Sequence, residues 1–345
     1  MSNKGRTYHL TLHRLFSRIG RRRSAAHRSA FLHLPALLLA CTPLPEFAPG
    51  PTPATRTAQI YILPSGNTTV RGLDLLFFQE EPLEKLDAWQ HLPGSIGGRV
   101  EGVSSIEARK LAAFGNLPEG YGWSDIRSYT SLKGKTFQLA DEDPAAPVLV
   151  GTAGLPEGSR RSCRITLKPM LARITLRSIA CDFTGRSYAG ERLQDVRAYL
   201  TYAVDVCCPF DPDVVPASWV NAGRLDESGT AALSHPETVL RDVATSLGGR
   251  IRPSLDFYCY PNPSDGTEFG QPVTRLVIEG RLRGTTYYYP IDLPGLKADV
   301  QYRMDVTLTR AGTTDPDIPA AAGTILLEST VMDWDGREWN DVHFS

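Results

Sequence analysis

The feature that most constrains the fold is an alternation of apolar and polar residues with a period of two, which recurs along the chain. Successive side chains of a β-strand point to opposite faces, so this pattern predicts strands that are buried on one face. Turn-forming stretches at 261–266, 294–295 and 312–317 separate the strands, a spacing typical of β-sandwiches. The apolar sets are Ile165 and Leu167; Ala172, Ile174 and Leu176; Val196, Ala198, Leu200, Tyr202, Val204 and Val206; Tyr287, Tyr289, Ile291 and Leu293; Tyr302, Met304, Val306 and Leu308; and Ile325, Leu327, Ser329 and Val331.

The first half of the chain is less regular. Segments 59–63 and 73–78 read as strands, 109–116 fits either a strand or a helix, and 237–244 predicts one short helix. Between 165–167 and 172–176 the phase changes, which predicts a bulge or bend at Pro169. Composition changes again at Leu155–Arg161. We therefore predict an all-β fold of two β-sandwich domains in tandem, residues 59–158 and 159–345.

The N-terminal segment has the order of a bacterial lipoprotein signal. A basic region is followed by the apolar run Phe31–Ala40, which is too short to span a bilayer but suits a secretory signal. Leu38-Leu39-Ala40-Cys41 then resembles a lipobox, in which the cysteine thiol receives diacylglycerol and becomes the mature N-terminus. A plain secretory signal that happens to carry a cysteine is the alternative. We predict a signal peptide at residues 1–40 and lipidation at Cys41.

Residues 41–58 contain the five prolines Pro43, Pro45, Pro49, Pro51 and Pro53. Proline at this density favours an extended, semi-rigid backbone without a core. We expect a tether that holds a folded body off a membrane surface.

The charge of the chain excludes some classes of partner. Its formal net charge is -1, but the eight Lys and Arg residues before position 41 are not balanced by any acid. Without them the chain has 29 basic and 38 acidic residues, so no basic surface for nucleic acid is expected on the folded part. No apolar run approaches the roughly 18 residues of a membrane-spanning helix.

The sequence carries no recognisable catalytic or metal motif. His91, His235 and His343 are far apart, and no His-Glu-x-x-His, Gly-x-Ser-x-Gly, P-loop or Gly-x-Gly-x-x-Gly stretch is present. The acidic pairs Asp211/Asp213 and Asp315/Asp317 read as solvated turns, and Asp333-Trp334-Asp335-Gly336 lacks the closing acid of a calcium loop. The triplet Tyr287–Tyr289 is read as core and cross-strand packing, with a sugar platform as the alternative. We expect no enzyme activity, metal or cofactor.

Five cysteines remain if Cys41 is acylated: Cys163, Cys181, Cys207, Cys208 and Cys259. An odd number leaves at least one thiol free or paired between chains. Cys163 and Cys181 could bridge neighbouring strands, whereas the adjacent Cys207 and Cys208 are poorly placed to pair. The sequence leaves the pairing open, with small apolar packing as the other reading for each cysteine.

Several segments in order resemble the fimbrillin-type family of Bacteroidales, including its lipoprotein anchor subunits of the FimB and Mfa-like kind. The resemblance covers roughly residues 60–335 and implies two transthyretin-like β-sandwich domains, an outer-membrane lipoprotein and a role in a fimbrium. The matching segments are Leu111–Asn116, Ile165–Ile174, Phe257–Pro263, Tyr287–Ile291, Tyr302–Val306, Thr309–Gly312, Asp315–Asp317 and Val331–Trp334.

Subunits of such fibres polymerise by β-strand addition, in which an extended segment completes a neighbour's sheet. The sequence ends eleven residues after Trp334 and leaves little spare chain for a donor strand. With the lipid at Cys41, this favours an anchor of the fimbrial shaft that limits its length, bound to a shaft subunit by strand addition. A fimbrial tip adhesin and a surface glycan-binding lipoprotein are the alternatives.

Lipidation at Cys41 generates a first prediction. Each buried methylene contributes about 0.8 kcal/mol, so several acyl chains hold a folded body on a membrane. We expect Cys41→Ala to release the body into the periplasm or the medium, as measured by fractionation of cells. Mass spectrometry that finds an unmodified Cys41 thiol in the mature wild-type protein would contradict this prediction.

Overall fold

The computed structural model describes residues 54–66, 68–158, 161–210, 216, 218–222, 233–334 and 336. Cys41, the predicted signal peptide and most of the predicted tether lie outside the described residues. Among those described, no helix has the length and apolar character needed to cross a membrane.

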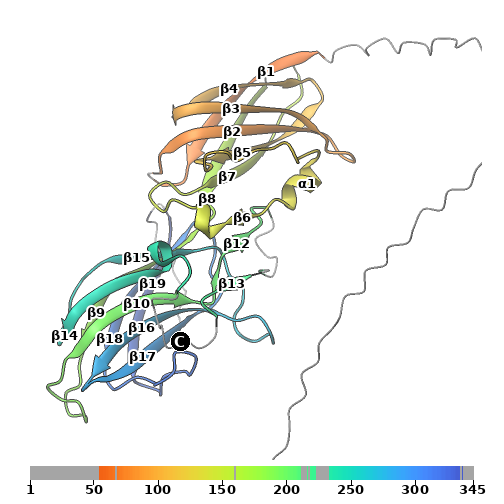
Figure 1. Ribbon diagram of the computed structural model, residues 1–345. Helices are drawn as coiled ribbons and strands as arrows, with labels where there is room; N and C mark the ends of the chain where they lie inside the picture. Colours follow the sequence, from red (N-terminus) through yellow and green to blue (C-terminus); the bar gives the residue numbers. More distant parts are fainter. Residues whose placement is uncertain are drawn as a thin grey trace, which may run out of the picture. The chain divides into compact units, whose positions relative to one another are not determined.

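The described residues form an all-β fold, as the alternation predicts (Figure 1). The helical segments are α1 (Tyr129–Lys133), η1 (Leu139–Asp141) and α2 (Pro236–Val239). The strands are β1 (Thr55–Pro64), β2 (Val70–Gln79), β3 (Leu86–Ile96), β4 (Arg99–Ser105), β5 (Ala108–Gly115), β6 (Phe137–Gln138), β7 (Leu149–Gly154), β8 (Arg161–Pro169), β9 (Ala172–Cys181), β10 (Leu193–Thr201), β11 (Ala203–Val204), β12 (Val206–Cys207), β13 (Trp219–Val220), β14 (Leu240–Leu247), β15 (Leu255–Cys259), β16 (Thr274–Leu282), β17 (Thr285–Leu293), β18 (Val300–Leu308) and β19 (Ile325–Asp333).

The first half of the chain forms one seven-stranded sheet in the order β3-β2-β5-β7-β8-β1-β4. β8 runs parallel to β1 along most of its length and pairs with β7 only at its last two residues, Lys168 and Pro169. Alternate side chains of these strands, such as Ile60, Phe77 and Ile165, share one apolar core. The sheet therefore curves around its own core.

The second half is a sandwich of two four-stranded sheets, β14-β10-β16-β17 and β15-β9-β18-β19. Both sheets contribute to the largest apolar cluster, for example through Leu200 of β10 and Met304 of β18. The same cluster includes Phe78 and Phe114, which lie on the face of the first sheet opposite its own core. Apolar packing is thus continuous between the two halves.

Strand pairing places the change between the two halves later than the composition predicts. The predicted boundary at residue 158 precedes β8, but the strand partners of β8 all belong to the first sheet. The change comes at Met170 and Leu171, between β8 and β9. β8 ends at Pro169, so the bend predicted there is the point at which the chain leaves the first sheet and enters the sheet of β9. The division into two domains stays a prediction.

Two other expectations are resolved by the structure. The segment 109–116, compatible with either strand or helix, lies in the strand β5 up to Gly115. The predicted helix at 237–244 is wrong beyond its first turn, because α2 ends at Val239 and the following residues form β14. β14 pairs with β10 along its length, and this long-range pairing outweighs local helix propensity.

A small polar junction joins the two halves beside the apolar one. β6 pairs with β12, and the Leu139 backbone N–H donates to the Asp205 carbonyl over 2.8 Å. The Glu142 carboxylate then accepts hydrogen bonds from the Val148 backbone N–H at 2.9 Å and from the Tyr260 hydroxyl at 3.1 Å. Burial raises the pKa of Glu142 to about 7, and the nearby Asp141 and Asp143 add to this rise.

This junction makes stability depend on pH. Because the folded pKa of Glu142 is raised, the folded state holds a proton that the unfolded state has lost at any pH between the two pKa values. The free energy of unfolding should therefore fall as pH rises from about 4.5 to about 7, by up to about 3 kcal/mol.

We expect Glu142→Gln to remove this contribution to the pH dependence and to unfold at a higher urea concentration than the wild type at pH 8. Urea titrations at pH 5 and pH 8 measure both effects. The exposed acid of β19 provides the control Glu328→Gln, which should leave the pH dependence intact. A Glu142→Gln variant with the wild-type pH dependence would rule out this role for the carboxyl.

Candidate functional site

The edges of the sheets are candidate docking sites, because the family resemblance implies association by strand addition. An edge strand has a row of backbone N–H and C=O groups that a second chain can pair with. The three large sheets end in the edge strands β3 and β4, β14 and β17, and β15 and β19. These edges differ in how far side chains and loops already occupy them.

The β4 edge is closed by side chains of β3. The Val103 backbone N–H donates to Gln90 Oε1 over 2.7 Å, and the Ser105 backbone N–H donates to Asp87 Oδ2 over 2.7 Å. The Ser105 hydroxyl donates to the other oxygen of Asp87. Gly102 precedes Val103 on β4, and a Cβ atom there would come within 2.5 Å of the Phe77 ring. Side-chain acceptors thus replace a strand ladder along this seam.

Two edges of the second half are partly covered. On β17, Tyr288 and Thr313 exchange backbone hydrogen bonds of 2.8 and 2.9 Å. On β14, the Arg192 guanidinium donates to the Ser246 hydroxyl over 2.8 Å and to its carbonyl over 3.3 Å. Neither edge is left as a continuous free ladder.

β19 presents a long edge that no described strand covers. Its nine residues pair with β18 from Leu308↔Ile325 to Val300↔Asp333, and no strand among the described residues pairs with its other side. Leu326 on this strand is 56% exposed, whereas Val331 is buried. Trp334 fixes the end of the strand, since its backbone N–H donates to the Asp299 carbonyl over 2.9 Å. We take the β19 edge as the candidate docking site.

The tyrosine triplet lies in the packing of the second sandwich. Tyr289 is fully buried and donates its hydroxyl to the Arg310 carbonyl over 3.1 Å. Tyr287 forms a 3.0 Å hydroxyl–hydroxyl hydrogen bond with Tyr188, and Tyr288 packs against a small cluster on the opposite face of the sheet. This arrangement agrees with the reading as core and cross-strand packing.

None of the five cysteines outside the signal forms a disulfide bond. Cys163 lies on β8 and Cys181 on β9, which belong to different sheets. Burial raises the pKa of Cys181, Cys207 and Cys259, each to about 12, which disfavours the reactive thiolate. Small apolar packing describes these side chains.

The candidate metal and acid residues do not converge in the described part of the chain. No group of three or more His, Cys, Asp or Glu side chains there is arranged to hold a metal ion. Asp315 and Asp317 form a turn in which the Asp317 backbone N–H donates to Asp315 Oδ1 over 3.0 Å. Asp211, Asp213, Asp335 and His343 lie outside the described residues.

Comparison with known proteins shows which fold this is. No protein-family model and no curated protein matches the chain. Solved structures do match, although sequence identity is low. A fimbrilin from Porphyromonas gingivalis W83 matches with a TM-score of 0.59 at 14% identity, over 82% of this chain and 98% of that chain.

A candidate cell adhesion protein from Bacteroides eggerthii DSM 20697 matches with a TM-score of 0.59 at 17% identity, over 82% of this chain and 97% of that chain. The tip fimbrial protein Mfa3 from Porphyromonas gingivalis, truncated at its C-terminus, matches with a TM-score of 0.50 at 12% identity, over 81% of this chain and 100% of that chain. The chain therefore has a fimbrillin-type fold, and the resemblance seen in the sequence is confirmed for the fold.

The seam between β3 and β4 generates a prediction about edge protection. Ser105 is buried, so Asp87→Ala would leave its backbone N–H without an acceptor at a cost of about 1–3 kcal/mol. We expect a lower urea midpoint and, because the β4 edge opens, concentration-dependent self-association in analytical ultracentrifugation. Asp87→Asn keeps an acceptor oxygen and should lose less. Equal stability of the alanine variant and the wild type would argue against this seam.

Proposed function

We propose that this protein is a non-enzymatic fimbrial subunit, namely the outer-membrane lipoprotein that anchors the fimbrial shaft and limits its length. The observation that carries the proposal is the fimbrillin-type fold, which is similar over most of the chain to proteins described as a fimbrilin and a tip fimbrial protein. Fold alone does not determine function, and the role within the fibre depends on particular segments of the chain.

The anchor role is supported by the sequence before the first strand. Leu38–Cys41 supplies a lipidation site, and the proline-rich segment that follows supplies a spacer before β1 begins at Thr55. Stable membrane attachment needs more than one acyl chain, which a lipobox cysteine receives. A body held in this way at the outer membrane would keep the end of a fibre at the cell surface.

The partner would be a shaft subunit that docks by β-strand addition. The free side of β19 offers backbone groups along nine residues, whereas β3 side chains already occupy the amides of β4. An anchor has to make this exchange on one side only, because lipid holds its other end. An open edge at β19 beside a closed seam at β4 suits a subunit that terminates a fibre.

A tip adhesin is the second candidate within the same class of protein. It is favoured by the similarity to the tip fimbrial protein, which covers 81% of this chain. A tip subunit would sit at the opposite end of the fibre, so its loss should affect adhesion before it affects retention of the fibre.

The deciding experiment measures cell-bound and released fimbriae. We expect deletion of the gene, and Cys41→Ala, to shed fibres into the medium and to lengthen them without stopping polymerisation of the shaft. Immunoblots of cell and medium fractions, with electron microscopy of fibre length, measure the effect. Cys208, a half-buried cysteine of the folded body, gives the control Cys208→Ala, which should keep fibres bound to the cell.

If wild type, Cys41→Ala and the deletion keep equal amounts of cell-bound fibre, the anchor role is wrong. If fibres stay attached but adhesion is lost, the tip role replaces it.

A further inference from the structure

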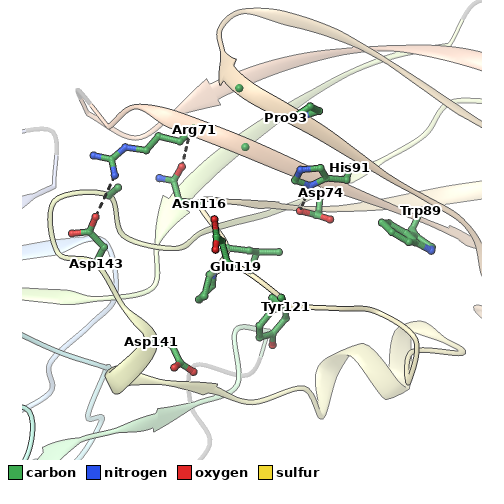
Figure 2. A pocket seen from close by; sticks show the side chains of 16 residues that line it. Arg71, Asp74, Trp89, His91, Pro93, Asn116, Glu119, Tyr121, Asp141 and Asp143 are labelled. Carbon is green, nitrogen blue, oxygen red and sulfur yellow. Dashed lines mark hydrogen bonds and ion pairs between the residues drawn. The ribbon is translucent and has the colours of Figure 1, made fainter.

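A pocket of about 940 Å³ lies in the first half of the chain, on elements other than β19. Figure 2 shows side chains from β2, β3 and the segments 116–121 and 141–146 facing one another across it. The lining combines two aromatic rings with several hydrogen-bonding groups. Its charged and aromatic members are Arg71, Asp74, Trp89, His91, Glu119, Tyr121, Asp141 and Asp143.

Asp74 fixes the polar centre of the pocket. This residue is buried on β2, where the surrounding strand is apolar, and Trp123 Nε1 donates to its Oδ1 over 3.1 Å. His91 Nδ1 lies 3.1 Å from Asp74 Oδ2. Because an ionised carboxylate can only accept, Nδ1 of His91 is the donor. The Nε2 atom of that ring is then available to a ligand, and each Asp74 oxygen keeps a second acceptor position.

Trp89 supplies a flat apolar surface beside this centre. It lies two residues before His91 on β3, so both side chains project from the same face of the strand. Trp89 is 53% exposed, which is unusual for so large an aromatic side chain. The exposed indole leaves room for a ring that is apolar on one face and hydroxylated at its rim.

Tyr121 forms a rigid wall on the other side. Its ring stacks on Phe137 at a centroid distance of 5.0 Å and meets Trp123 edge-on at 5.4 Å. Burial raises the pKa of Tyr121, with Asp125 and Asp141 adding to the rise, so the phenol stays neutral. Its hydroxyl donates to the Thr136 carbonyl over 3.3 Å. These contacts fix the shape of the pocket before any ligand enters.

The charges of the lining select against anions. Four carboxylates line the pocket, those of Asp74, Glu119, Asp141 and Asp143. The guanidinium of Arg71 is already paired with Asp143 at 3.2 Å. An acidic ligand would therefore meet net repulsion, whereas neutral hydroxyls can donate to these oxygens.

We propose that this pocket binds a neutral oligosaccharide, with one sugar ring stacked on Trp89 and its hydroxyls hydrogen-bonded to Asp74 and to Nε2 of His91. The proposal goes beyond the fimbrial role and does not depend on it. Neutral sugars reach a cell-surface protein from host glycans or from the surface polysaccharide of the producing bacterium, and the chemistry of recognition is the same for both.

The test uses the full mature protein on an array of neutral, sialylated and sulfated oligosaccharides. Polysaccharide from the producing bacterium and a polylysine probe are printed beside them, so that the two sugar sources and a basic peptide are distinguished. Hits are titrated by calorimetry. We expect binding to neutral members, weakened about tenfold or more in Trp89→Ala and in His91→Ala. The fully exposed Phe269 lies outside the pocket and gives the aromatic control Phe269→Ala, which should bind as the wild type does.

Circular dichroism is used to check that each variant is folded. Trp89→Phe keeps a smaller aromatic ring and should bind with intermediate affinity. The proposal is overturned if no neutral oligosaccharide or polysaccharide binds, or if folded Trp89→Ala and His91→Ala variants bind with wild-type affinity. Preference for sialylated or sulfated sugars, or binding to polylysine alone, would overturn it as well.

Discussion

The parallel pairing of β8 with β1 is the interaction on which the rest of the structure depends. It joins Ala58 to Arg161 and Pro64 to Leu167, and it closes the seven-stranded sheet around its core. The Arg161 side chain strengthens this closure, because its buried guanidinium donates to the carbonyls of Ser105, Ile106 and Ala108 at the β4–β5 turn. Since β9 begins three residues after β8 ends, the same pairing also sets where the second sandwich starts.

A sheet that curves in this way still has two ends, and the chain treats them in a specific manner. Asp87 and Gln90 of β3 accept from backbone amides of β4, so the gap between the two end strands is filled by side chains. The second half leaves β19 without a partner strand on one side among the residues described. An unprotected edge strand can pair with another extended chain. Closing one edge while another stays open therefore restricts such pairing to a defined place on the molecule.

Local patterns predict the strands well, and long-range pairing accounts for the differences. Alternation over Tyr302–Leu308 and Ile325–Val331 predicts β18 and β19, because the period of two is a property of each strand alone. The place of β8 could not be predicted, since its apolar face fits either half until its pairing with β1 is known. Similarly, the apolar series from Val196 to Val206 is interrupted at Tyr202, whose φ of 51° breaks the strand without any change in the alternation.

The pocket shows most clearly what a sequence hides. Its one visible signal is Asp74, an acid inside the apolar stretch Leu73–Phe78, and such a residue is retained in a buried strand only where partners satisfy it. Those partners are His91 from β3 and Trp123 from the segment that covers the sheet, and neither is near Asp74 in the sequence. The pocket belongs to β2, β3 and adjoining segments, whereas the open edge belongs to β19. Substitutions at Trp89 and at Leu326 therefore act on different elements, so the proposed sugar binding and the proposed strand addition can be tested one at a time.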